Sequence, residues 1–268
     1  MSTEIRELSS VEELAALAEL FAVVWGRPGD PPIGSDVLKA LANSHNYVAG
    51  GYVDGQLTGG LVGWFGGRPP RELHLHSHIL GVLPGSDARG LGFTMKQHQR
   101  LWCVERDIKV IEWTTDPLVR RNAYFNLSKL GARAPEYLVN VYGSMRDGIN
   151  EGEESDRLLI RWSLDSKEAT DAADARPVEP DVDRLTRSGA AVILAAGPAG
   201  EPAEQKSSAP ILLCQVPDDI VALRRESPSL ARRWRIALRG AMSGALHAGY
   251  EVTGATRSGW YVLRLRRH

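Results

Sequence analysis

The spacing of apolar residues predicts two helices near the start of the chain. Ser10 and Glu13 form the S-x-x-E pattern of a capping box. Apolar residues then recur at helical intervals, at Leu14, Leu17, Phe21, Val24 and Trp25. A Pro- and Gly-rich loop over residues 26–34 precedes a shorter predicted helix over about 36–42.

Strand patterns follow. Residues 47–53 and 56–65 read as two strands, and Asp54-Gly55 between them is a strong hairpin signal. Further strands are predicted over 74–83, 110–113, 137–142 and 157–164. Helices are predicted over about 90–106 and 118–130, the second closed by Gly131 in a left-handed conformation. Gly59, Gly60 and Gly63 interrupt the second strand, which indicates a bulge, the close approach of a ligand, or accommodation of twist at a sheet edge.

The composition changes after residue 165. Residues 165–187 hold few large apolar residues and read as a linker, and residues 197–209 form a second loose stretch. Strands are predicted over 191–194, 210–216, 250–254 and 260–265, with a helix that begins at Ser227-Pro228. We therefore expect a first domain over 1–165, a linker over 166–209 and a small α/β extension over 210–268.

Composition narrows the class of protein. The chain has 268 residues, of which 43% are hydrophobic and 24% charged, and its formal net charge is −1. With a net charge near zero, the protein has no overall positive potential that would attract nucleic acid. No apolar run approaches the ~20 residues that span a bilayer. Cys103 and Cys214 stand apart in apolar segments, which indicates buried free thiols. We expect a cytoplasmic protein with neither a nucleic-acid nor a membrane partner, and we allow for a homodimer.

The residues with the clearest chemistry lie between 74 and 92. His74, His76 and His78 alternate along a predicted strand and should project to one face, with Leu75, Ser77 and Ile79 on the other. The strand ends in a Gly-rich turn, Arg89-Gly90-Leu91-Gly92, which opens a helix. Backbone N–H groups at such a helix N-terminus form a ready anion site.

The histidines alone allow three interpretations. They could be polar residues of a half-exposed strand or hydrogen-bonded core residues. They could share a metal ion, although no carboxylate or cysteine cluster completes a ligand set. One or two of them could act as a general base, because an imidazole titrates near neutral pH.

The order of these elements resembles the GNAT superfamily of acyl-CoA N-acyltransferases over about residues 3–165. The phosphate loop of that family typically reads Val-x-Pro-x-x-Arg/Gln-x-x-Gly-x-Gly/Ala, and Val82, Pro84, Gly90 and Gly92 fall in register with it. Residues 116–131 resemble the family's fourth-helix motif, with Ala123 and Gly131 in register. More narrowly, the chain resembles an uncharacterised branch of predicted acyltransferases with a C-terminal extension.

The resemblance implies a fold and an activity. The fold is a mixed, mostly antiparallel central sheet flanked by helices, with the small C-terminal α/β extension added. The activity is direct transfer of an acetyl or other small acyl group from acyl-CoA to a small amine or amino-acid-like acceptor, with no metal. His76 and His78 match a His-x-His pair of related acetyltransferases and become the candidate base, and Tyr124 becomes a substitute acid. The implied cofactor-binding residues are Leu80, Gly81, Val82, Arg89, Gly90, Leu91, Gly92 and Asn122.

Two positions depart from the family pattern, and one alternative function follows. Asp87 stands where the loop usually has Arg or Gln, and Leu127 stands where the fourth helix often carries a tyrosine acid. The alternative is therefore a non-catalytic acyl-CoA-binding sensor. Arg232, Arg233, Arg235 and Arg239 on the late helix are expected to form a solvated face rather than a nucleic-acid site.

Overall fold

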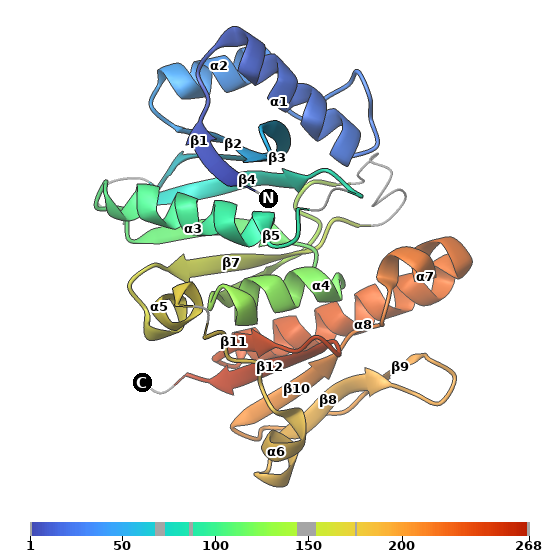
Figure 1. The fold of residues 1–268 in the computed structure, drawn as a ribbon. Coiled ribbons are helices and arrows are strands. Elements are labelled where there is room, and N and C mark those ends of the chain that lie inside the picture. Colours follow the sequence, from blue (N-terminus) through green and yellow to red (C-terminus); the bar gives the residue numbers. More distant parts are fainter. Residues whose placement is uncertain (1, 68–72, 86–87, 144–153, 175, 267–268) are drawn as a thin grey trace. The chain divides into compact units, whose positions relative to one another are not determined.

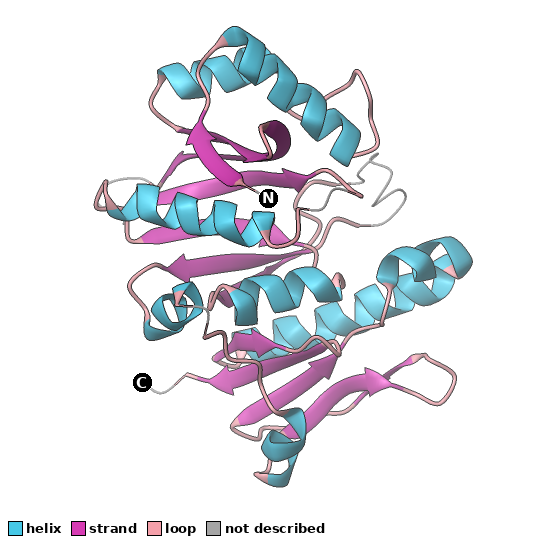
Figure 2. Cartoon of the chain, viewed as in Figure 1, coloured by secondary structure: helices cyan, strands magenta, loops and turns pink. Residues whose placement is uncertain are grey.

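The computed structural model describes residues 2–67, 73–85, 88–143, 154–174 and 176–266. Two compact units divide the described chain, one up to Trp113 and one from Thr114 onward. Figure 1 traces the chain and Figure 2 shows where helices and strands alternate along it. No helix in the described ranges combines the length and the apolar character needed to cross a membrane.

The first unit is a sheet in the order β1-β2-β3-β4-β5, covered by helices. Strands β1 to β4 run antiparallel to their neighbours, and β5 pairs parallel to β4. Its elements are β1 (Thr3–Glu7), α1 (Val11–Val24), α2 (Ser35–Asn43), β2 (Tyr47–Val53), β3 (Gln56–Gly66), β4 (His74–Val82), α3 (Leu91–Val104) and β5 (Val110–Thr115). The predicted mixed and mostly antiparallel fold class is confirmed. The sequence patterns did not predict β1.

Local signals of the sequence formed as predicted in this unit. The Ser10 side chain accepts from the Glu13 N–H and the Glu13 side chain accepts from the Ser10 N–H, so the capping box is complete. Asp54 and Gly55 both have positive φ, 48° and 79°, as the hairpin turn between β2 and β3 requires.

Glycines of β3 let two helices approach the sheet from opposite sides. A Cβ at Gly59 would lie 3.0 Å from Leu91 and Met95 of α3, whereas one at Gly60 would lie 2.3 Å from Leu17 of α1. Because neighbouring residues of a strand point to opposite faces, α1 and α3 cover opposite faces. Close approach therefore occurs at both positions, but the approaching groups are helices rather than a ligand.

The second unit is a sheet in the order β7-β6-β11-β12-β10-β8-β9, with α8 packed along it. Its elements are α4 (Arg120–Ala123), the π-helix η1 (Tyr124–Lys129), β6 (Arg133–Leu138), β7 (Arg157–Ser163), α5 (Lys167–Ala173), α6 (Val182–Arg187), β8 (Ala191–Ala196), β9 (Pro202–Glu204), β10 (Ile211–Gln215), α7 (Ile220–Glu226), α8 (Pro228–His247), β11 (Tyr250–Ala255) and β12 (Trp260–Leu265). Since β6 pairs with β11, residues 133–138 and the C-terminal segment share one sheet.

The structure corrects several boundaries here. The stretch read as a linker contains α5 and α6, whose N-termini are capped by Ser166 and Asp181. The strand predicted over 137–142 begins earlier, at Arg133, and the second loose stretch contains β9. The two compact units divide at Trp113, and the domain boundary expected at 165 stays a prediction.

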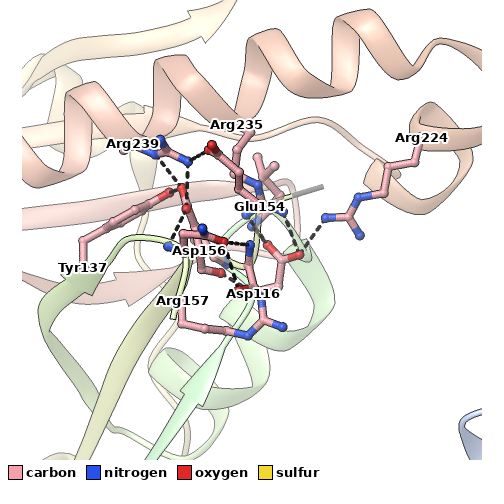
Figure 3. A network of polar contacts seen from close by, with 12 residues as sticks. Asp116, Tyr137, Glu154, Asp156, Arg157, Arg224, Arg235 and Arg239 are labelled. Atoms are coloured by element: carbon pink, nitrogen blue, oxygen red, sulfur yellow. Dashed lines mark hydrogen bonds and ion pairs between the residues drawn. The ribbon is translucent and has the colours of Figure 1, made fainter. Parts of the chain in front are cut away.

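Buried ion pairs hold α7 and α8 in the second unit (Figure 3). The Asp116 carboxylate, just after β5, accepts two bonds from Arg235 at 2.8 and 3.0 Å and one from Arg224 at 2.6 Å. Asp156 accepts two bonds of 2.9 Å from Arg239 and one of 2.7 Å from Tyr137. The solvated face expected for α8 is therefore wrong for Arg235 and Arg239; Arg232 and Arg233 are exposed.

Candidate functional site

A β-bulge lies in the middle of the histidine strand. Val62 of β3 pairs with Ile79, and the next residue, Gly63, pairs with Ser77, so His78 is an extra residue of β4. A bulge interrupts the ladder of backbone hydrogen bonds and re-aims the side chains around it. It therefore changes the alternation that a regular strand would have.

The bulge corrects the predicted faces of β4. Ser77 Oγ accepts a bond of 2.7 Å from Lys96 of α3, whereas Ile79 packs in the apolar cluster that includes Leu17 of α1. Since α3 and α1 cover opposite faces, Ser77 and Ile79 do not share a face. The simple period of two fails at His78 because one residue is added there.

Three aromatic rings gather beside the bulge. The Trp64 ring centroid lies 5.1 Å from that of His76 and 4.4 Å from that of His78, and the two imidazoles are 5.7 Å apart. His74 lies farther along the strand, with Nε2 at 3.4 Å from Oε2 of Glu112. The two candidate bases thus stand together against a tryptophan, and the third histidine has its own carboxylate neighbour.

Both candidate bases have lowered pKa values. Desolvation, followed by the nearby His78, His74 and Lys96, lowers the pKa of His76 to about 4. Desolvation lowers the pKa of His78 as well. Both imidazoles are therefore neutral at pH 7 and can accept a proton.

Strands β4 and β5 diverge beside the bulge. In the described chain they pair only at Leu75 with Ile111 and at His76 with Glu112. From Leu80 to Val82 the β5 side of β4 has no strand partner among the described residues, which leaves main-chain hydrogen-bonding groups at an open edge. The predicted positions for cofactor contact, Leu80, Gly81 and Val82, lie on this edge.

The N-terminus of α3 begins beside that edge. Gly90 adopts a left-handed conformation with φ of 88°, and a Cβ at Gly92 would lie 3.8 Å from Leu80 and 3.9 Å from Val82. The Leu91 N–H donates to Ala88 at 3.1 Å. Within the described ranges, the N–H groups of Arg89, Gly90 and Gly92 have no protein acceptor, so they can bind an anion. Asp87 lies outside the described residues.

The metal interpretation finds no geometric support. Over the described parts of the chain, no three His, Cys, Asp or Glu side chains lie close enough together to hold a metal ion. The imidazole contacts are those of rings beside a tryptophan, not of a ligand set.

The remaining predicted residues lie in the second unit. Asn122 is exposed on α4, and Tyr124 opens the π-helix η1, a distortion that often occurs at functional sites. The Arg257 guanidinium lies 4.2 Å from the centroid of the Tyr124 ring, and desolvation raises the pKa of that phenol. Leu127 is buried in the core.

Lys96 is a residue that the sequence reasoning missed. Its side chain is buried, with Nζ bonded to Ser77 at 2.7 Å and to Gln99 at 3.1 Å, and lying 3.9 Å from the Trp113 ring centroid. Desolvation lowers its pKa to about 7. The sequence feature that could have revealed it is its position on the helix. Residues 91, 95, 99 and 102 form the inward face of α3, and residue 96 lies next to that face.

Comparisons with known proteins return structures but no families. No family model and no curated protein matches the chain. The putative acetyltransferase yncA of Salmonella typhimurium, solved with acetyl-CoA, is 16% identical over 68% of this chain and 99% of its own, with a TM-score of 0.49. A GNAT-family acetyltransferase from Streptococcus pneumoniae is 13% identical over 60% of this chain and 99% of its own, with a TM-score of 0.49.

A third similar structure is Naa50 of Arabidopsis thaliana in complex with a bisubstrate analogue, CoA-Ac-MVNAL. It is 18% identical over 61% of this chain and 99% of its own, with a TM-score of 0.47.

Proposed function

We propose that this protein is an acyl-CoA-dependent N-acyltransferase that moves an acetyl or other small acyl group directly to a small amine or amino-acid-like acceptor. The observation that carries the proposal is the bulge at His78. It sets two neutral imidazoles beside a strand edge that is open among the described residues. That edge leads to a helix N-terminus whose N–H groups have no acceptor in the same part of the chain. A base, a backbone edge and an anion site are the three parts that such a transfer needs.

The residues of the first unit fit an acyl-CoA donor. The open edge from Leu80 to Val82 can pair with the amide-bearing arm of the donor, as an added strand would. The N–H groups of Arg89, Gly90 and Gly92 can hold its diphosphate. When bound, the thioester supplies an electrophilic carbonyl and a thiolate leaving group.

The chemistry then divides among this chain's side chains. His76 or His78 takes a proton from the ammonium form of the acceptor, and the free amine attacks the carbonyl carbon. Backbone N–H groups near Leu80 stabilise the developing oxyanion. Tyr124, whose raised pKa keeps it protonated at neutral pH, is the proposed donor to the leaving thiolate. We assign the protein to the cytoplasm, where buried thiols such as Cys103 and Cys214 stay reduced.

The donor site is tested by thermal unfolding with CoA, acetyl-CoA and succinyl-CoA. A ligand at ~100 times its dissociation constant stabilises the folded state by about 2.7 kcal/mol. Gly92→Ala is the matched variant: its Cβ meets no protein atom closer than 3.8 Å, so the fold tolerates it, but it crowds the anion site. We expect Gly92→Ala to lose most of the ligand shift. Gly244→Ala on α8, where a Cβ meets nothing within 4 Å, should keep it. No shift with any donor would refute the proposal.

Catalysis is tested by free-thiol release with a panel of small amines and amino acids. We expect His76→Ala or His78→Ala to lower kcat about 10²- to 10⁴-fold while the donor-induced thermal shift remains. If His76 is the base, its pKa of about 4 keeps it deprotonated near neutral pH. Protonation of His76 should then cause no decrease of kcat/KM near pH 6.5. Ligand shifts without turnover of any amine would favour the sensor alternative, which the buried Leu127 in the place of an acid also suits.

A further inference from the structure

A cavity of about 770 Å³ lies within the second unit, and its lining includes none of the residues proposed above for the base or the donor site. It is lined by the end of η1, the start of α5, the segment 178–181, α6, and the strands β11 and β12. Its volume falls within the range of small-molecule pockets.

Part of the lining is apolar. Leu127, Val178, Pro180, Leu185 and Val262 contribute to the walls. Val178 is 71% exposed, whereas Val262 is buried. Such a surface gains from contact with the hydrocarbon part of a ligand.

The acidic groups of the lining are already paired within the protein. Glu168 accepts from Arg133 at 2.9 Å, and Asp171 pairs with Lys167. Glu179 accepts from the backbone N–H of Arg257 at 2.7 Å and pairs with its guanidinium, and Asp181 caps α6. Each of these carboxylates therefore already has a partner within the protein.

The hydroxyl groups of the lining are satisfied in the same way. Ser128 donates to the carbonyl of Ala255, Ser188 to that of Arg184, and Thr253 to that of Val262. The bonds of Ser128 and Ser188 are 2.5 Å, and that of Thr253 is 3.4 Å.

Two cationic side chains of the lining, unlike the groups above, have no partner among the described residues. The guanidinium groups of Arg184, on α6, and Arg264, on β12, bond to no protein acceptor in the part of the chain that the structure describes. The lining therefore offers two guanidinium groups that no described protein group engages, and the fork of a guanidinium matches a carboxylate. Two such guanidinium groups match a single carboxylate group.

We propose that this cavity binds a small organic monocarboxylate with an apolar body. Arg184 and Arg264 hold the carboxylate, and Val178, Pro180 and Leu185 contact the body. This site is independent of the proposed acyl transfer: either can fail without the other.

The test is a titration followed by two-dimensional ¹H–¹⁵N NMR on the full chain, with acetate, hexanoate and hexylamine as probes. We expect saturable shifts from hexanoate in residues 178–188 and in the side chains of Arg184 and Arg264. Acetate should bind at least tenfold more weakly, because it lacks the apolar body. Hexylamine should not bind there, because its charge is opposite.

Substitutions test which arginines bind the carboxylate. Arg184→Gln with Arg264→Gln should weaken hexanoate binding at least tenfold. Arg187→Gln, exposed on α6 and outside the lining, should not. An unchanged spectrum elsewhere shows that the variants fold. The proposal is overturned if hexanoate gives no saturable shift at this cavity, if hexylamine binds there as well as hexanoate, or if Arg187→Gln weakens binding as much as the double variant.

Discussion

At the scale of single residues, the chain places ionisable groups where solvent is excluded. Lys96 has neutral partners, a hydroxyl, an amide oxygen and an indole face, in place of a counterion. Burial of an ammonium group without an opposite charge is costly, and the lowered pKa is the measure of that cost. The group lies directly behind the strand that carries His76.

This burial predicts a pH dependence of stability. The folded-state pKa of Lys96 is about 7 and its ordinary value is 10.5. Between these values the unfolded chain binds a proton that the folded chain lacks, so stability rises with pH, by at most about 1.4 kcal/mol per pH unit. We expect Lys96→Met to lose this rise and to be more stable at pH 7 by about 1–4 kcal/mol.

Urea unfolding at pH 7 and pH 9 measures both effects. Lys109→Met is the matched control, because Lys109 is exposed in the same unit. A Lys96→Met variant with the same pH slope as the Lys109→Met control, or with lower stability at pH 7, would contradict the account of an uncompensated cation.

At the scale of elements, single positions decide how strands and helices end and meet. One extra residue at His78 breaks the β4 ladder. Gly131 ends η1 with φ of 73°, as the sequence predicted, and also lies against the start of α5. A Cβ there would lie 2.5 Å from the backbone carbonyl of Glu168, which is too close for any rotamer change to relieve.

Substitution of Gly131 separates these two requirements. Gly131→Ala should lose the left-handed preference, worth about 1–2 kcal/mol, and a further 1–3 kcal/mol through the clash with α5. Gly200→Ala is the matched control, since φ is 79° there and a Cβ meets nothing within 4 Å. Chemical denaturation of the two variants measures the difference. Equal losses would show that packing against α5 contributes nothing.

At the scale of the whole molecule, charges far apart in sequence hold the C-terminal helices. Asp116 and Arg235 are 119 positions apart, and Asp156 and Arg239 are 83 apart, yet both pairs are bidentate. The two arginines lower the pKa of Asp116 well below its ordinary range in spite of desolvation, which acts the other way. Stability from this carboxylate is therefore present above its unfolded pKa near 4 and decreases as the pH falls below that value.

Removal of the Asp116 charge leaves two buried guanidinium groups facing a neutral amide. We expect Asp116→Asn to lower the free energy of unfolding by about 3–5 kcal/mol and to lose cooperative docking of α7 and α8. Asp165→Asn, exposed in the same unit, is the control and should change it by less than about 0.5 kcal/mol. Hydrogen exchange of α8 together with urea unfolding measures both. A loss no larger than that of the control would contradict the role of the ion pairs.

What the sequence determined by itself is local. The capping box, the Asp54-Gly55 turn, the left-handed Gly131 and most strands follow from residue patterns, because caps, turns and side-chain periods are fixed by nearby backbone geometry. The histidines and the Gly-rich turn were found in the same way, as neighbours along one segment.

Only the tertiary structure decided the rest. The bulge at His78, the burial of Lys96 and the pairing of Asp116 with Arg235 depend on segments that meet in space but are distant in sequence. The helices of the stretch read as a linker belong here too, because α5 buries Ala169 and Ala172, residues too small to give an apolar pattern. Packing energy is gained between elements, so a pattern within one element could not predict it.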